Sequence, residues 1–325
     1  MRLAFGLGLL VLALFFMSLL SGAANASVAD SLRALLSGEG PLGTVMQQIR
    51  LPRALLGVMV GLSLGLAGAA MQGYLRNPLA EPGLIGISSS AALGAVIALQ
   101  TGFAASFALA LPISALGSAF VAVLMIMFLA GPRGGALTLI LAGIAISALA
   151  GAFTSLALNL SPNPYATSET IFWMMGSLKD RSFNHVEIAL PFCVVGWLAL
   201  MSTGKALNAL TLGEDAAQSL GINLTATRLI VIFGVAAVVG ASTAVAGAIG
   251  FVGLVVPHIL RPFVKARPSD LLWASALGGA AMVLAADIAV RWILPDRDLK
   301  IGVLMAIVGA PLFLHLIYKT RAELS

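Results

Sequence analysis

Residues 82–132 read PGLIGISSSAALGAVIALQTGFAASFALALPISALGSAFVAVLMIMFLAGP, and none of these 51 residues is charged. An α-helix crosses the hydrocarbon core of a bilayer with about 20 apolar residues. The stretch is therefore too long for one membrane span and suits two. We expect the chain to turn near Gln100, Thr101 and Gly102.

The composition extends this interpretation to the whole chain. Of its 325 residues, 60% are hydrophobic and only 10% are charged, whereas a soluble domain carries about 25% charged residues. So few charges cannot cover a water-facing surface. Transmembrane barrels are excluded as well, because their strands alternate apolar and polar residues and the apolar runs here are continuous. We predict an all-α polytopic membrane protein with nine to ten helices.

The remaining apolar runs complete a single transmembrane domain, 1–325. Its predicted parts are a first helix (1–24), an amphipathic segment (25–53), helices two to six (54–204), a polar segment (205–228) and helices seven to ten (229–325). Residues 3–20 exceed the 7–15 residues of a signal-peptide core, so we expect a retained helix although Ala24-Asn25-Ala26 mimics a cleavage site. Residues 229–260 should hold one span and a second, short or broken one.

Charged groups inside the predicted spans are scarce. Only Asp287 lies clearly within an apolar run, four residues before Arg291. This spacing places both side chains on one helix face, where they can form a structural ion pair. An ion-coupled carrier needs carboxylates at mid-membrane to load its ion, so that alternative is disfavoured.

Chemistry-bearing motifs give little support to an enzyme. The chain has no G-x-x-x-x-G-K-[ST] loop for ATP, and its three histidines lack metal-ligand spacing. We predict no catalytic residue and no metal site, and a membrane-embedded enzyme is left without positive evidence. The +5 charge is typical of membrane loops, so we expect no nucleic acid partner. The energy for uphill transport would then come from a partner protein. We expect this partner to bind the amphipathic helix predicted at 211–221.

Several longer strings resemble the FecCD family, the permease subunits of type II ATP-binding-cassette (ABC) importers for iron-siderophores, haem or cobalamin. The matching strings are RLPR (50–53), GAAMQ (68–72), RNPLAEP (76–82) with Gly86, WMMGS (173–177), LNAL (207–210), LGE (212–214), LG (220–221), GAIGFVGLVVPH (247–258), Asp287, Arg291 and GAPLF (309–313). The family's E-x-P-x-G before the last helix is replaced by Asp298-Leu299-Lys300-Ile301-Gly302. Without the proline, the first turn of the last helix lacks a residue whose φ is already fixed near the helical value.

The resemblance implies ten helices in a bacterial inner membrane, with both termini cytoplasmic and a translocation path between two copies of the chain. It further implies two ATPase subunits that hold ATP and Mg, a periplasmic substrate-binding protein, and no cofactor on this chain. The cargo would be an iron chelate such as a siderophore complex or haem, or cobalamin.

Three sets of site residues follow from the resemblance. The segment that couples to the ATPase comprises Gly213, Glu214, Ala217, Leu220 and Gly221. Arg50, Arg53 and Arg291 would dock the binding protein through charge-assisted pairs with its carboxylates. Asn77 and Leu79, together with Ala136 and Leu137 of the 134–138 loop, would narrow a cytoplasmic gate.

Overall fold

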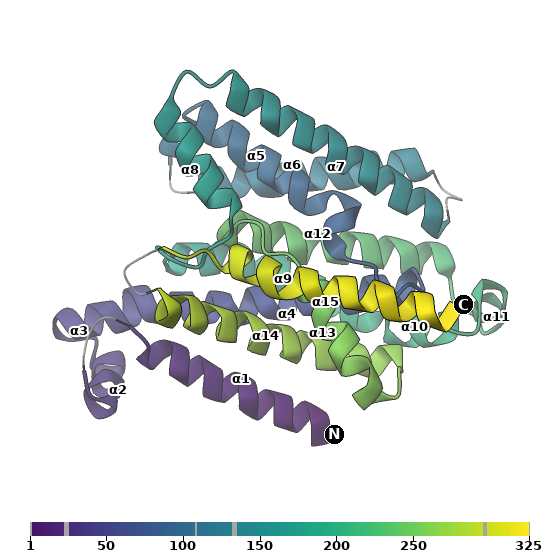
Figure 1. Cartoon of the computed structure of the whole chain (residues 1–325), viewed down its shortest axis with the longest axis horizontal. Helices are drawn as coiled ribbons and strands as arrows, with labels where there is room; N and C mark the ends of the chain where they lie inside the picture. The colour runs from purple at the N-terminus through teal and green to yellow at the C-terminus, as the bar shows by residue number, and fades with distance from the viewer. Residues whose placement is uncertain (1, 23–25, 108, 132–134, 295–297, 325) are drawn as a thin grey trace.

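The computed structural model describes residues 2–22, 26–107, 109–131, 135–294 and 298–324, and the regular structure in these ranges is entirely helical. Figure 1 shows long helices running side by side, with both chain termini at the same end of the bundle. We call this the α11 end, after α11 (Glu214–Ser219). The opposite end, which carries α2 (Val28–Ser37), is called the α2 end.

Ten apolar helices account for the predicted spans within the described residues. Seven are long enough to cross a membrane: α1 (Arg2–Leu20), a continuous helix Gly40–Tyr74 that ends in α4 (Leu51–Tyr74), α6 (Ala110–Ala130), α7 (Ala136–Asn159), α9 (Phe183–Ser202), α12 (Leu224–Ala246) and α14 (Pro268–Ile293). Three more contain shorter apolar stretches: α5 (Ile87–Gln100), α13 (Val252–Leu260) with the turn that follows it, and α15 (Ile301–Leu324), whose apolar part is Ile301–His315. The predicted fold class is confirmed.

Helix α4 forms the centre of the bundle, packed against α14, α12, α13 and α9. Its contact with α14 depends on glycine. A Cβ on Gly65 would collide with the carbonyl oxygen of Ser275, and one on Gly279 would collide with that of Gly61. Lipid tails are as apolar as leucine, so helices in a membrane gain stability from such close packing rather than from hydrophobicity. By contrast, α1 lies at the edge of the bundle and is mostly exposed.

The predicted turn and the predicted break are both present. Residues 101–109 join α5 to α6, and Gly102 takes a left-handed φ of 73° there. After α12 the chain leaves the helix at Gly247 and resumes as α13 at Val252. The sequence did not reveal α8 (Pro164–Met174), whose N-cap residue Asn163 accepts the Tyr165 backbone N–H through its side chain.

The structure differs from the predicted boundary at residue 53. A helix already begins at Gly40 as α3 (Gly40–Thr44), with Pro41 in its first turn, and continues through a π-helical turn at Val45–Arg50 into α4. Proline is tolerated in a first turn, but farther along it clashes with the carbonyl four residues earlier. The wider π turn lies directly before Pro52 and provides room for it.

Candidate functional site

The predicted coupling segment forms two short helices at the α11 end, α10 (Gly204–Leu210) and α11. Gly213 and Gly221 bound α11 with φ of 104° and 82°, values that favour glycine because they crowd a Cβ. Glu214 and Asp215 occupy its first turn, where the helix dipole stabilises negative charge. The helix is shorter than the predicted 211–221.

Hydrogen bonds attach this segment to the bundle. The Asn208 amide nitrogen donates to Ser269 Oγ at 3.0 Å, and the Ser269 backbone N–H donates to Asn208 Oδ1 at 3.0 Å. This reciprocal pair joins α10 to the first turn of α14. Farther out, Arg76 and Glu214 form an ion pair of 3.5 Å with half-exposed side chains. An ion pair this exposed contributes little to stability.

The exposed surface of the segment is apolar as well as acidic. Leu212 is 69% exposed and Leu220 is 63% exposed, beside the exposed Glu214 and Asp215. Ala217 departs from the predicted face, because it is fully buried and belongs to the core. It packs against the bundle instead of facing outward, so the exposed surface of this segment includes Leu212, Glu214, Asp215 and Leu220 but not Ala217.

At the α2 end, two arginines pair with one buried carboxylate, and a third, Arg50, lies close to Arg291. We call Arg50, Arg53, Asp287 and Arg291 the arginine cluster. Asp287 is 1% exposed, and its two oxygens lie 2.8 Å from Arg53 Nη2 and 2.8 Å from Arg291 Nη2. The predicted pair between Asp287 and Arg291 is confirmed, and Arg53 shares the same carboxylate.

The same arginines close the C-terminal end of α1. Arg291 Nη1 donates to the carbonyls of Ser18 and Ser21 at 3.0 and 2.9 Å. Arg50 Nη1 donates to that of Leu19 at 3.1 Å. The last carbonyls of a helix lack intrahelical hydrogen-bond donors and carry partial negative charge. The guanidinium groups supply both the donors and a positive charge.

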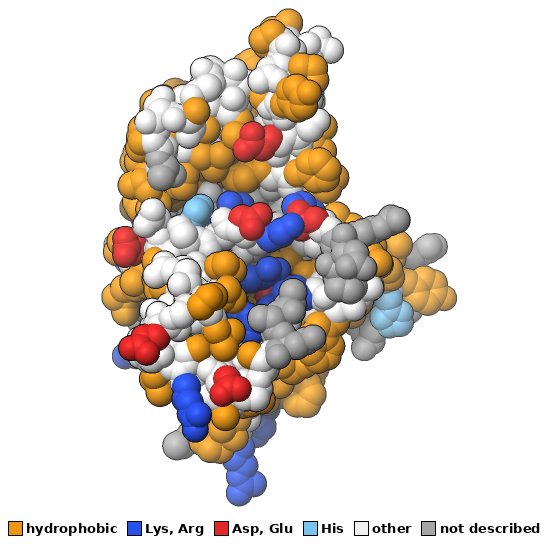
Figure 2. Space-filling model, turned by 90° about the vertical axis from the view of Figure 1, so that its left-hand side faces the viewer, with side chains coloured by type: hydrophobic (Ala, Val, Ile, Leu, Met, Phe, Trp, Pro, Cys, Tyr) orange, Lys and Arg blue, Asp and Glu red, His pale blue; other side chains and the backbone are white. Residues whose placement is uncertain are grey.

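This arrangement restricts what the three arginines can offer a docking protein. Figure 2 shows basic side chains gathered near the middle of the α2 end, with acidic ones around them. The side chains of Arg53 and Arg291 are only 16% and 14% exposed, and Arg50 is buried. Their docking role stays a prediction.

The non-consensus stretch before α15 forms a second charged group at this end. Asp298 Oδ2 lies 2.5 Å from Lys300 Nζ and 3.7 Å from Lys179 Nζ, and Lys300 Nζ also sits 5.6 Å from the centre of the Phe172 ring. Burial acts to raise the pKa of Asp298, but the hydrogen bond and the two lysine charges outweigh it and lower the pKa below its usual 3.8. Helix α15 begins at Ile301 without the family's proline.

The predicted gate residues lie on two connections. Asn77 is exposed, and its side-chain oxygen accepts the backbone N–H of Leu79 at 2.9 Å, which fixes a tight turn after α4. Leu137 is 69% exposed in the first turn of α7. Of Ala136 the backbone is described but not the side chain. The gate also stays a prediction.

One long-range contact beside these residues was not predicted. The Phe251 backbone N–H donates to Glu81 Oε1 at 2.7 Å, which joins the connection after α4 to the break between α12 and α13. Phe251 has a φ of 66°, a strained value for a bulky residue. Aromatic residues give no sequence signal of such a conformation, whereas Gly247, with a φ of 72° in the same break, did.

The GAAMQ string has a structural meaning that its composition does not show. Gln72 accepts a hydrogen bond of 2.6 Å from Arg261 Nη2 and donates to the carbonyl of Gly253 at 3.3 Å. A Cβ on Gly68 would collide with the same Gly253 carbonyl. Gly68 and Gln72, one turn apart, therefore seat α13 directly on α4.

Metal ligation has no geometric basis in the described part of the chain, where no three His, Cys, Asp or Glu side chains lie close enough together to hold an ion. The side chain of Cys193 is buried in the core, where its sulfur accepts a hydrogen bond of 3.6 Å from Ser63 Oγ. What the molecule offers is thus an exposed acidic and apolar segment at one end and a largely buried basic cluster at the other.

Comparisons with known proteins identify the family of the chain. The model of the FecCD transport family matches residues 10–319. A hemin transport system permease of Yersinia pestis is 37% identical, covering 98% of this chain and 97% of its own length. A vitamin B12 import system permease of Klebsiella pneumoniae is 36% identical, covering 99% and 95%. An Fe(3+)-citrate import system permease of Bacillus subtilis is 35% identical, covering 98% and 92%.

A solved structure extends the likeness to three dimensions. It is described as an inward-facing conformation of a metal-chelate type ABC transporter, and it superimposes with a TM-score of 0.87 at 32% sequence identity. The match covers 98% of this chain and 99% of that chain.

Proposed function

This chain belongs to the FecCD transport family, and we propose that it is the membrane-spanning permease subunit of a binding-protein-dependent ABC importer. Its relatives are named as permeases for hemin, Fe(3+)-citrate and vitamin B12. We infer the same cargo classes here: an iron chelate, haem or cobalamin.

The observation that carries the proposal is the pair of exposed leucines, Leu212 and Leu220, on the polar α11 end. Apolar side chains on a surface that faces water are typical of a protein interface. The acidic Glu214 beside them adds a charge that a basic partner can match. We propose that an ATPase subunit covers this surface and that ATP hydrolysis there drives transport, with ATP and Mg held by the partner.

The orientation and assembly follow from this assignment. The α11 end would face the cytoplasm together with both termini, and the α2 end would face a periplasmic binding protein. Its carboxylates would meet the partly exposed Arg53 and Arg291 or the lysines around Asp298. A second copy of the chain would complete the path, with Asn77, Leu79 and the start of α7 at its cytoplasmic exit.

The test is reconstitution of the chain in proteoliposomes with its ATPase and binding protein. We expect ATP-dependent uptake of one of three probes: haem, a ferric siderophore or cobalamin. Leu220→Glu should abolish both assembly with the ATPase and uptake. Leu36→Glu is the matched control, because Leu36 is 87% exposed but lies on α2 at the opposite end; it should leave ATPase assembly intact.

An ion-coupled carrier makes the opposite prediction, namely uptake by the purified chain alone. Asp287 cannot easily serve such a carrier, because two guanidinium groups already neutralise its buried carboxylate. Uptake without an ATPase, or an intact assembly in the Leu220→Glu variant, would contradict the importer mechanism proposed here.

A further inference from the structure

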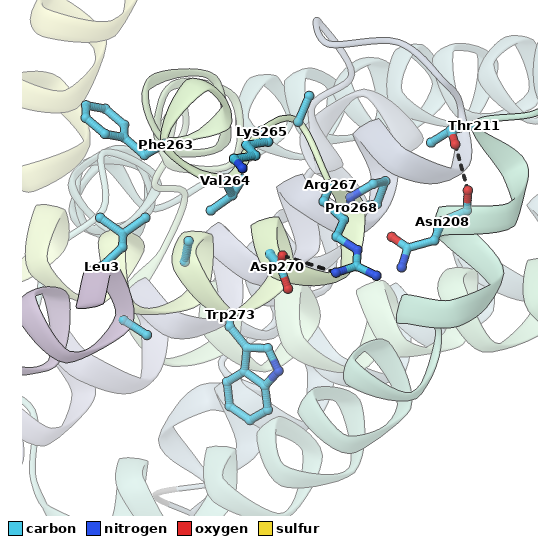
Figure 3. A pocket seen from close by; sticks show the side chains of 13 residues that line it. Leu3, Asn208, Thr211, Phe263, Val264, Lys265, Arg267, Pro268, Asp270 and Trp273 are labelled. Carbon is cyan, nitrogen blue, oxygen red and sulfur yellow. Dashed lines mark hydrogen bonds and ion pairs between the residues drawn. The ribbon is translucent and has the colours of Figure 1, made fainter. Parts of the chain in front are cut away.

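A pocket of about 1080 Å³ opens at the α11 end, and α10 of the coupling segment forms one side of it. Figure 3 shows it bounded by the start of α1, the end of α10, and the turn that joins α13 to α14. Its wall includes Leu3 and Asn208 and, from that turn and the first turns of α14, Lys265, Arg267 and Trp273. Of its wall, Asn208 belongs to a family string, but the proposed transport cycle assigns no ligand to this pocket.

The turn places its cations in fixed positions. Lys265 and Ala266 are consecutive residues with left-handed φ of 51° and 55°, a costly conformation for residues other than glycine. Three backbone hydrogen bonds hold it, from the N–H groups of Lys265, Ala266 and Arg267 to the carbonyls of Pro262, Arg261 and Val264. The turn therefore fixes the backbone at Lys265 and Arg267, which both line the same pocket.

The charge at the pocket is incompletely balanced. Asp270 is the acidic residue of its wall, and it reaches Arg267 only at 4.0 Å, with both side chains more than half exposed. Lys265 is exposed and forms no ion pair with an acidic side chain among the described residues. Arg2, next to Leu3 at the start of α1, adds another exposed cation at this end. The pocket therefore favours an anion.

The pocket also lies at the level where membrane meets water. Helices α1 and α14, both long enough to span, begin beside it. Phe263 is 68% exposed and Trp273 is 61% exposed, and exposed aromatic rings at span ends are typical of the interfacial belt. Its α1 wall is mostly exposed and apolar, so the pocket opens sideways toward lipid as well as toward water.

We propose that this pocket binds the headgroup of an anionic phospholipid. The phosphate would lie between Lys265 and Arg267, and an acyl chain would follow Leu3 and Trp273 along α1. Basic pockets between spans at the membrane surface are suited to such headgroups. The proposal rests on the proposed function only for naming the leaflet as the cytoplasmic one.

The test measures lipid binding to the purified chain in detergent by native mass spectrometry. Phosphatidylglycerol should bind about 25-fold more tightly than phosphatidylcholine with the same acyl chains, because two cations contribute. The double variant Lys265→Asn/Arg267→Gln should lose most of that preference, since each cation near an anionic surface contributes about fivefold. Asparagine is chosen at 265 because it tolerates a left-handed φ.

Lys205→Asn is the matched control, because Lys205 is exposed on α10 and lies outside the pocket wall; it should bind phosphatidylglycerol like the unchanged chain. The proposal is overturned if the double variant keeps the preference, or if millimolar inorganic phosphate displaces the lipid. It is also overturned if the double variant loses assembly with the ATPase while still binding phosphatidylglycerol normally. Because the binding assay needs no ATPase and no uptake, its result is separable from failure of the proposed function.

Discussion

The two ends of the molecule use charge in opposite ways. In the arginine cluster at the α2 end, Asp287 is 1% exposed and bonded to two guanidinium groups at 2.8 Å. At the α11 end, Glu214 is 54% exposed and faces Arg76 at 3.5 Å. Water and salt screen the second pair but hardly reach the first. Buried charges at one end therefore hold helices together, whereas exposed charges at the other remain free to pair with a partner.

The sharpest way to break this comparison is to remove the buried carboxylate. Asp287→Ala leaves the guanidinium groups of Arg53 and Arg291 without their counter-ion, and breaking one side of a buried pair costs about 3–5 kcal/mol. We expect a large fall in the thermal unfolding temperature of the purified protein and faster proteolysis of α1, because Arg291 also binds the carbonyls at the end of α1.

Asp270→Ala is the control for that loss. Asp270 pairs with Arg267 at 4.0 Å on an exposed surface, so its removal should cost less than about 1 kcal/mol. Equal destabilisation by the two substitutions would show that burial of Asp287 has no special weight.

At the other end, a backbone change should affect function more than stability. Gly213→Ala forces a side chain onto a φ of 104° although no atom lies within 4 Å of the new methyl group. The strain is about 1–3 kcal/mol, enough to shift α11 and lower ATP-dependent uptake about tenfold. Gly151→Ala adds the same methyl group in open space but within the regular helix α7, and it should keep normal uptake. Equal uptake in both variants would contradict a coupling role for α11.

The lysine–Asp298 group tests the comparison at an intermediate exposure. The folded pKa of Asp298 lies below its usual 3.8, so its contribution to stability is present above about pH 4 and is lost as the pH falls through the lowered pKa. We expect the unfolding temperature to fall less steeply below pH 4 in Asp298→Asn than in the unchanged chain. Glu39→Gln, at an exposed position of the same end, should retain the steeper fall; identical curves for all three proteins would exclude the effect.

The smallest effect is expected at Arg76 and Glu214. Arg76→Gln removes an exposed ion pair, and such pairs contribute about 0–1 kcal/mol. The unfolding temperature of the isolated chain should change little, while binding of the ATPase should change by a measurable factor if Glu214 becomes free to meet it. A destabilisation as large as that of Asp287→Ala would remove the distinction between the two ends.

Much of the fold could be predicted from the sequence because it depends on local patterns. Long uncharged runs mark spans, and the run at 229–260 was long enough to indicate the break that the structure places at Gly247 to Phe251. The pair between Asp287 and Arg291 was predictable because four residues make one helical turn. The start of the second span could not be predicted, because no pattern of residue types marks the π-helical turn found there.

The site was harder to predict because its contacts join distant parts of the chain. Arg53 reaches Asp287 across 234 positions, and hydropathy does not say which spans become neighbours. Ala217 illustrates a second limit: the spacing of Glu214, Ala217 and Leu220 describes one side of a helix, but not whether the bundle covers part of it. The buried side of α11 is set by α10 and α12, which pack against it.

Helix α14 gives the two ends a mechanical connection. Its 26 residues form a rod about 39 Å long. Near one end of α14, Ser269 is hydrogen-bonded to Asn208 of α10. About 27 Å along the helix, Asp287 pairs with Arg53 of α4 and with Arg291, which binds the end of α1. Any displacement of α10 that preserves both hydrogen bonds must carry this rod with it. If ATP hydrolysis displaces α10 at one membrane surface, as proposed, α14 would transmit that displacement to the other surface as one rigid helix.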